Sequence, residues 1–327
     1  MEELGRQKTE LLLKIGLDFI DLLGVYRFRI SGEGEFVQKD MAKISQRAAS
    51  LVDEAWDNLG ASRTPNPLPL RRAVSDILQQ SEDVAGLSED PKSNNLYGDH
   101  SLQVCRLSLL IARGAELSEE NLQDLGVAAM FHDMGYAARE GADPKKGEEG
   151  FAPPFERHGA AGARVLLRQR GFNQAKVKRV LSALEHHRDY LYEGGTPHLF
   201  ARIIRIAEDY SNLTSRRGAG LTPHLALKSM AASAGTRYDP ILFQVFVNKM
   251  GLYPPGSILR IEVELSTGRY QFIVLSSSLC TSEQNFAQPK CRLLQLPDGT
   301  DCPRSYSEKL LDLATKKHKV LEVLHDF

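Results

Sequence analysis

The 327-residue sequence predicts a mainly α-helical protein in three parts. Helical hydrophobic periodicity dominates from about residue 68 to 250, and alternation of apolar and polar residues replaces it near the C-terminus. The segment ASRTPNPLP, residues 61–69, holds three prolines, each of which removes a backbone donor and disfavours helix in the preceding residue. We therefore expect an N-terminal module over 1–64, an all-helical bundle over 65–252 and a small β-rich extension over 253–327.

The N-terminal module is expected to contain two helices, over 7–24 and 38–59, because both stretches carry helical periodicity. Between them, VYRFRISGEGEFV alternates like a short hairpin with a glycine-rich turn. The module holds no readable motif. Regulation, binding of a protein partner and dimerisation of two copies all stay open as its role.

Composition excludes several classes of partner. The formal net charge is −1 and the pI is near 6.8, so no global field draws the protein to nucleic acid or to an anionic membrane. Charged residues interrupt every apolar run of the opening MEELGRQKTELLLKIG, which argues against a secretory segment, and no stretch of roughly 18 apolar residues predicts a transmembrane helix. We expect a cytoplasmic protein that binds neither nucleic acid nor membrane.

The first two helices expected in the middle region each present a histidine. Asp99 can cap a helix on which His100 begins a buried stripe. Ser118 can cap the next helix, which ends in His132 and Asp133 just before a glycine.

Three further helices present the remaining candidates. His158 opens HGAAGARVLL, whose small residues permit close helix packing, and His186 and His187 end VKRVLSALEHH. Consecutive helical residues diverge by about 100°, so both of these rings can serve one ion only near a helix end. The helix FARIIRIAEDYSNL carries Glu208 and Asp209. In the C-terminal extension, SILRIEVEL, RYQFIVLSSS and CRLLQL read as strands.

The spacing of these side chains predicts a metal site. Five of the nine histidines lie between positions 100 and 187. Imidazole and carboxylate ligands suit iron, manganese or zinc. The candidates exceed what one tetrahedral ion needs, and they fit two ions about 3.5–4 Å apart that share a carboxylate. A lone histidine near an apolar face is more often a core residue, but several buried imidazoles and carboxylates without a metal would carry a large desolvation cost.

At this point the sequence resembles the HD superfamily of metal-dependent phosphohydrolases, and specifically its HD-GYP branch, which hydrolyses the bacterial messenger cyclic di-GMP. The resemblance covers roughly residues 68–275. It rests on six blocks in the same order: HSLQV, AAMFHDMG, RHGAAGARVL, EHHRD, ARIIRIAEDYSNLTSRR and GTRYDPILFQVF.

The resemblance implies an HD-type helical bundle and a centre of two divalent transition-metal ions, with iron favoured and manganese or zinc as alternatives. One ion would be held by His100, His132, Asp133 and Glu208, with Asp209 as the alternative to Glu208 if the alignment shifts by one residue. The other ion would be held by Asp133, His158, His186 and His187. The implied catalytic residues are His132 and Asp133, with a metal-bound water as nucleophile, and the implied substrate contacts are Arg217, Arg188 and Thr196.

Several positions depart from the family pattern. Gly195-Thr196-Pro197 stands in place of Gly-Tyr-Pro, Tyr136 replaces a lysine three residues after the HD aspartate, and Gly220 stands where a lysine accompanies the family's phosphate-contacting arginine. Leu96 stands where a three-metal subgroup has glutamate, which favours two ions. Three hypotheses follow: a phosphodiesterase for cyclic di-GMP or a related cyclic dinucleotide, with weak activity admitted; a degenerate member that binds a nucleotide or protein partner in signalling; and a phosphohydrolase of another small phosphate ester.

Overall fold

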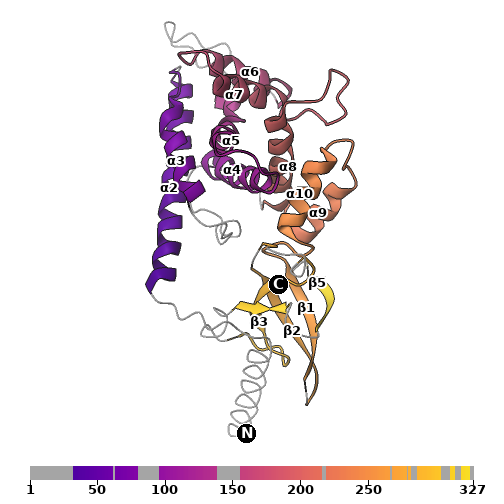
Figure 1. Ribbon diagram of the computed structural model, residues 1–327. Coiled ribbons are helices and arrows are strands. Elements are labelled where there is room, and N and C mark those ends of the chain that lie inside the picture. Colours follow the sequence, from indigo (N-terminus) through magenta and orange to yellow (C-terminus); the bar gives the residue numbers. More distant parts are fainter. Residues whose placement is uncertain are drawn as a thin grey trace.

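The computed structural model describes residues 32–61, 63–79, 96–137, 155–215, 219–265, 267–277, 279–280, 286–302, 310–313 and 318–324. Within them a helical body is followed by one small antiparallel sheet, which confirms the predicted fold class (Figure 1). The helices are α2 (Gly32–Gly60), α3 (Pro67–Gln79), α4 (Leu96–Gly114), α5 (Glu119–Phe131), the 3₁₀ turn η2 (Met134–Ala137), α6 (Phe155–Leu167), α7 (Gln174–Glu185), α8 (Leu199–Thr214), α9 (Pro223–Ala231) and α10 (Pro240–Met250).

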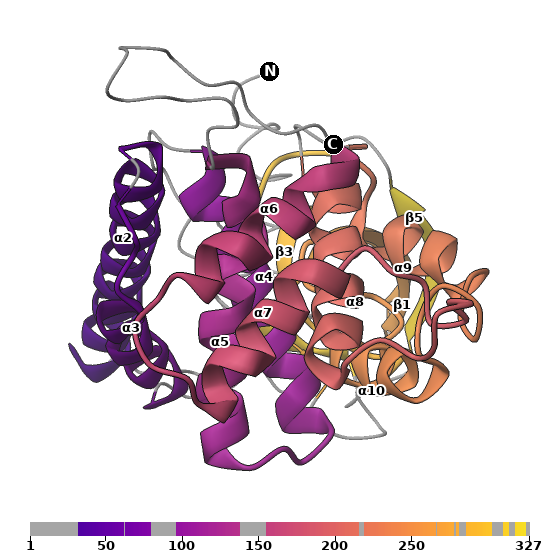
Figure 2. The same cartoon turned by 90° about the horizontal axis from the view of Figure 1, so that it is seen from above.

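The helices pack around one hydrophobic cluster. Helix α4 lies at its centre and packs against α2, α5 and α8, and its residues Leu102, Leu107 and Ile111 are fully buried. Viewed from above, α2 and α3 flank this bundle on one side, and α9 and α10 lie on the other (Figure 2). Burying these apolar side chains contributes roughly 1.5–3 kcal/mol each relative to exposure, so this core dominates the stability of the helical body.

Local signals fix several helix boundaries. The Ser118 and Asn173 side chains accept hydrogen bonds from backbone N–H groups in the first turns of α5 and α7, at 3.4 and 2.9 Å. Asp99 was expected to cap α4, but the helix begins at Leu96 and Asp99 lies in its first turn, where a negative charge still favours the helix N-terminus.

The N-terminal region differs in part from the expectation. The hairpin predicted for VYRFRISGEGEFV is wrong in its second half, because α2 begins at Gly32 and continues to Gly60. The predicted helix over 7–24 lies outside the described residues. Val52 and Trp56 of α2 are buried in the same cluster as the bundle. The domain boundaries at residues 64 and 252 stay predictions.

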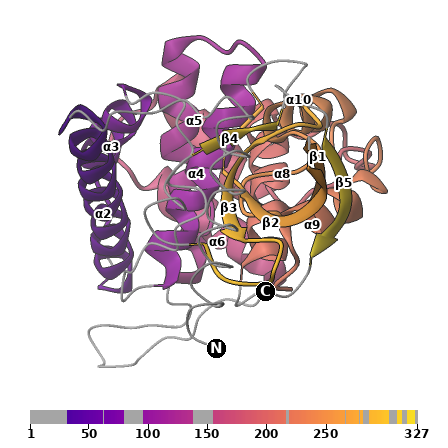
Figure 3. The same cartoon turned by 90° about the horizontal axis from the view of Figure 1, so that it is seen from below.

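The C-terminal sheet has the order β4-β3-β2-β1-β5, and all its described pairings are antiparallel. The strands are β1 (Ile258–Leu265), β2 (Gly268–Ser276), β3 (Lys290–Gln295), β4 (Leu310–Asp312) and β5 (His318–Leu324). The sheet has its own apolar core, which includes Leu259, Ile261 and Phe272. Seen from below, the strands lie across the α8–α10 side of the helical body (Figure 3).

The sheet and the helices meet through backbone contacts at the end of α10. The N–H of Leu252 donates to the carbonyl of Phe286 at 2.7 Å, and the N–H of Cys280 donates to that of Lys249 at 2.9 Å. Among the described residues, none of the helices combines the length and apolar character that a membrane crossing requires.

Candidate metal centre

The predicted ligands converge in the interior of the helical body. His100 comes from the first turn of α4, and His158 from α6. His132 and Asp133 follow α5, His186 and His187 follow α7, and Glu208 lies on α8. Of the seven, His100 and His187 are half-buried and the others are buried. The structure therefore brings together all seven side chains from five different helices.

Two helices end at the cluster. His132 and His186 are the C-terminal caps of α5 and α7, so the following residues, Asp133 and His187, leave the helical path. As a result His186 and His187 turn their rings toward the same group, with centroids 4.1 Å apart. The expectation that both rings meet only at a helix end agrees with this geometry.

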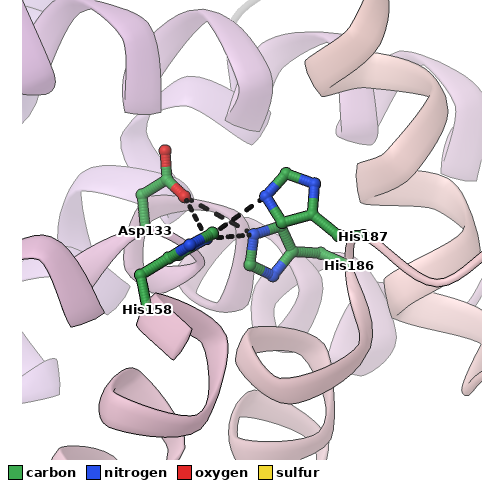
Figure 4. A group of neighbouring side chains, drawn as sticks. All are labelled: Asp133, His158, His186 and His187. Atoms are coloured by element: carbon green, nitrogen blue, oxygen red, sulfur yellow. Dashed lines mark hydrogen bonds and ion pairs between the residues drawn. The ribbon is translucent and has the colours of Figure 1, made fainter. Parts of the chain in front are cut away.

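The seven side chains form two groups that share Asp133. In each group one ligand atom per residue lies within 4.8 Å of all the others. The first group is His100, His132, Asp133 and Glu208, and the second is Asp133, His158, His186 and His187. Figure 4 shows His158 and His186 joined to the Asp133 carboxylate by dashed lines, and His187 joined to His158.

The carboxylate of Asp133 divides its oxygens between the groups. Oδ2 lies 3.3 Å from Nε2 of His132 and 3.7 Å from Nε2 of His100. Oδ1 lies 3.3 Å from Nε2 of His158 and 3.4 Å from Nε2 of His186. One carboxylate with an oxygen on each side is the arrangement that a bridging ligand between two ions requires.

Backbone carbonyls orient two of the rings. Nδ1 of His132 lies 2.6 Å from the carbonyl oxygen of Ala129, and Nδ1 of His186 lies 2.9 Å from that of Ala183. A carbonyl oxygen only accepts, so these Nδ1 atoms carry the proton. The lone pairs on the two Nε2 atoms then face the centre, as in metal-binding histidines.

Buried polar atoms at the centre test whether a metal fits. Nε2 of His132, Oδ1 of Asp133 and Oε2 of Glu208 are buried and have no hydrogen-bond partner among the described residues. Such atoms cost free energy unless something satisfies them. A divalent cation in each group would satisfy all three, and the mixed imidazole and carboxylate donors suit iron, manganese or zinc.

The electrostatics favour deprotonated donors at most positions. Burial lowers the pKa of His100 to about 4 and that of His187 to about 2, and it also lowers the pKa of His186. Burial opposes the charge of Asp133, but the charge of the adjacent His132 holds the pKa of this carboxyl well below its usual range.

His132 and Glu208 differ from these side chains. Burial opposes the charge of His132, but the carboxylate of Asp133 raises its pKa to about 9, while burial and the charge of Asp133 raise the pKa of Glu208 to about 8. Metal ligands are deprotonated, so metal binding would displace a proton from these two side chains.

Asp209 was the alternative to Glu208, and the structure places it elsewhere. Its Oδ2 accepts from the hydroxyl of Tyr238 at 2.8 Å and lies 3.0 Å from Nε of Arg237 and 3.4 Å from Nε of Arg205. Glu208 is 3% exposed and belongs to the first group. Proximity thus favours Glu208 over Asp209 as the candidate ligand.

The structure supports the expected substrate contacts less clearly than it supports the candidate metal ligands. Arg188 lies 2.9 Å from Glu185 and stacks on Tyr192, so its charge is already paired. Thr196 is exposed in the loop before α8. Arg217 lies outside the described residues. Their roles stay predictions.

Sequence reasoning missed two side chains that touch the cluster. Arg205 lies 3.0 Å from Nδ1 of His187, and the Ser211 hydroxyl lies 3.4 Å from Nδ1 of His100. Both residues lie on α8, three residues either side of Glu208. Their position one helical turn from a candidate ligand is the signal that could have identified them.

Comparison with known proteins agrees with this geometry. Residues 97–213 match the family model of the HD domain, and this range contains all seven candidate ligands. These residues therefore form an HD domain, a class of domain that binds divalent metal.

The chain is also similar to part of a bacterial phosphodiesterase. The cyclic di-GMP phosphodiesterase PA4108 of Pseudomonas aeruginosa is 31% identical over 176 residues, which cover 50% of this chain and 41% of that protein. The chain therefore spans about two fifths of this relative's length. Bd1817 of Bdellovibrio bacteriovorus, titled an HDG"Y"P protein, is a structural neighbour with a TM-score of 0.47, 16% identity, and coverage of 62% of this chain and 69% of the other. The HD-domain match and the Pseudomonas relative, without the structural neighbour, confirm the resemblance to the HD-GYP branch of the HD superfamily.

Proposed function

We propose that this protein is a di-metal phosphodiesterase that hydrolyses cyclic di-GMP or a related cyclic dinucleotide. The observation that carries the proposal is the pair of four-residue groups joined by Asp133. The Pseudomonas relative is named as a cyclic di-GMP phosphodiesterase, which supports the choice of substrate class. The proposed ions are two divalent transition metals, with iron favoured over manganese and zinc.

When bound, two divalent ions would supply a nucleophile from water at neutral pH and would stabilise the charge on the phosphate. The protein's part is to hold the donors in place. His132 and His186 are fixed by hydrogen bonds to backbone carbonyls, and Asp133 is held in the turn between α5 and η2. These contacts preorganise the centre, so little reorganisation is needed when a phosphodiester binds.

Incubation of metal-loaded protein with cyclic di-GMP, followed by chromatography of the products, tests the proposal. We expect a linear dinucleotide or GMP with iron, manganese or zinc, and no product from His132→Ala. The matched control is His224→Ala, because this histidine lies on α9 and contacts the carbonyl of Leu252 rather than the centre. Absence of product with all three metals would contradict the proposal.

A second candidate function rests on Tyr136. Its ring stacks on His158, with centroids 4.1 Å apart and planes 10° apart, where family members carry a lysine. An aromatic ring there supplies no positive charge to a phosphate. This observation favours a degenerate member that binds a nucleotide or a protein partner in signalling. Calorimetric binding of cyclic di-GMP without turnover would support it, and turnover lost in His132→Ala would overturn it.

A further inference from the structure

The guanidinium of Arg205 contacts the outer edge of the His187 ring. Its NH1 lies 3.0 Å from Nδ1 of His187. The other nitrogen of this ring, Nε2, lies 3.2 Å from Nε2 of His158 and 3.6 Å from Oε1 of Glu208. The Arg205 side chain is 8% exposed, so water competes little for this contact.

A guanidinium has donors only, so Nδ1 of His187 must accept this hydrogen bond. A neutral imidazole carries one proton, which therefore lies on Nε2 and points into the cluster. His158 is near enough to accept it. His187 is thus the reverse of His132 and His186, whose Nδ1 atoms face carbonyl oxygens and whose Nε2 atoms are left as acceptors.

We propose that Arg205 holds the proton of His187 on Nε2 and thereby weakens the second metal position, so that the group containing His100 fills first. This inference rests on the proposed metal centre. To bind an ion through Nε2, His187 would have to move its proton to Nδ1, which would place two donors against each other at the Arg205 contact. Either Arg205 leaves the ring or the ion is held by the other three donors.

Two carboxylates keep Arg205 in place. Its Nε lies 3.4 Å from Oδ2 of Asp209, and its NH2 lies 3.4 Å from Oδ1 of Asp189. Asp209 is also bound by Arg237 and Tyr238, so a substitution at Arg205 leaves this half-buried carboxylate with partners. A variant at Arg205 therefore changes the contact with His187 without leaving an isolated charge.

The proton position can be measured without metal. In metal-free full-length protein labelled with ¹⁵N-histidine, long-range ¹H–¹⁵N correlation spectra distinguish the two tautomers, and a His187→Gln spectrum assigns the resonances. We expect the Nε2–H tautomer for His187 and the Nδ1–H tautomer for His132 and His186. An Nδ1–H tautomer at His187 would overturn the proposal.

The consequence for metal binding is tested by equilibrium dialysis against Mn²⁺ with elemental analysis. Arg205→Gln keeps most of the side-chain length and offers an oxygen that accepts from Nδ1–H, whereas Arg205→Lys keeps a donor only. We expect Arg205→Gln to bind the second Mn²⁺ about 10- to 100-fold more tightly than the wild type, the range typical of partners that orient metal ligands, and Arg205→Lys to resemble the wild type.

Equal second-site affinity in all three proteins, or the same gain in both variants, would overturn the proposal. If none of the proteins binds Mn²⁺, the order of filling fails together with the proposed metal centre. The tautomer spectra are recorded without metal, so a failure at Arg205 and a failure of the metal centre give different results.

Discussion

The two ligand groups around Asp133 share one carboxylate and differ in charge. The first group adds Glu208 to Asp133, so it holds two carboxylates and two imidazoles, whereas the second holds one carboxylate and three imidazoles. Once metal binding has displaced the protons of His132 and Glu208, the first group offers more negative charge to a divalent cation than the second. Arg205 places its guanidinium directly against His187 of the second group. The comparison teaches that similar donors need not make equal sites, because neighbouring charge and hydrogen bonding tune each one.

The largest expected effect comes from the residue that both groups share. Asp133→Asn keeps the shape of the side chain and removes the charge that would bridge two ions. We expect metal affinity to fall by more than about 100-fold, beyond the usual effect of partners that only orient ligands. Elemental analysis after dialysis measures this change. Retention of two ions per chain by Asp133→Asn would refute the shared-ligand arrangement.

The next substitutions test whether Glu208, rather than Asp209, holds an ion in the first group. Glu208→Gln should lose one ion and retain the other, because Glu208 belongs to the first group alone. Asp209→Asn is the matched control, since Asp209 contacts Arg237 and Tyr238 and should not change the metal content. The same dialysis experiment compares the two variants. Loss of an ion in Asp209→Asn but not in Glu208→Gln would reverse the assignment.

The turn η2, which follows the shared ligand Asp133, packs closely against α6, which carries His158. This close approach requires a glycine at position 135. A Cβ at this position would lie 1.7 Å from the carbonyl oxygen of His158 and 2.8 Å from the backbone nitrogen of Gly162. We expect Gly135→Ala to lower the free energy of unfolding by about 3 kcal/mol or more, because backbone atoms cannot move aside as a flexible side chain can.

Gly171→Ala provides the control. Its Cβ would meet no atom within 4 Å, although its φ of +79° makes alanine unfavourable by about 1–2 kcal/mol. Urea denaturation of metal-free protein measures both variants. A smaller loss in Gly135→Ala than in Gly171→Ala would show that the two segments are not packed as described.

The smallest expected effect concerns the packing of α2 against α4, the helix that carries His100. Burial, followed by the charges of Asp99 and Asp57, raises the pKa of Asp53 on α2 from 3.8 to about 6. The folded state therefore holds this proton more tightly than the unfolded state, and Asp53 destabilises the fold increasingly as pH rises from about 4 to 6. We expect Asp53→Asn to raise the Tm at pH 8 and to have little effect at pH 4.

Glu54→Gln, at an exposed position on the same helix, controls for the removal of one negative charge. Thermal unfolding followed by circular dichroism at the two pH values measures the difference. An equal rise in Tm for Asp53→Asn at pH 4 and pH 8 would show that the raised pKa of Asp53 is not the cause of the stabilisation.

Strong periodicity made much of the helical body and the central strands predictable. The expected strand SILRIEVEL corresponds to β1, but β5 was not predicted. Its side chains are half-buried or exposed, so burial imposes little alternation on the sequence, and β5 pairs only with β1 among the described strands. The hairpin expected near Gly32 is wrong from this residue onward, because α2 begins there. Alternation over only a few residues does not distinguish a strand from a helix.

The candidate site was predictable where ligand chemistry restricts the residue type. Histidine and aspartate at helix ends predicted a metal site, and the resemblance to the HD-GYP branch implied how the ligands divide into two groups. The choice between Glu208 and Asp209 needed the packing of α8, because only this packing shows Asp209 turned toward Arg237 and Tyr238. The contact between the Arg205 guanidinium and His187 could not be predicted, because it depends on the relative placement of α7 and α8, which sequence spacing does not give.

Anomalous X-ray diffraction from crystals of the Mn²⁺-loaded protein tests the central claim most directly. The account predicts two peaks about 3.5–4 Å apart, on opposite sides of the Asp133 carboxylate and each bound by one of its oxygens. The peak beside His100 and Glu208 should have the higher occupancy at limiting metal. A single peak, or two peaks with no Asp133 oxygen between them, would contradict the account.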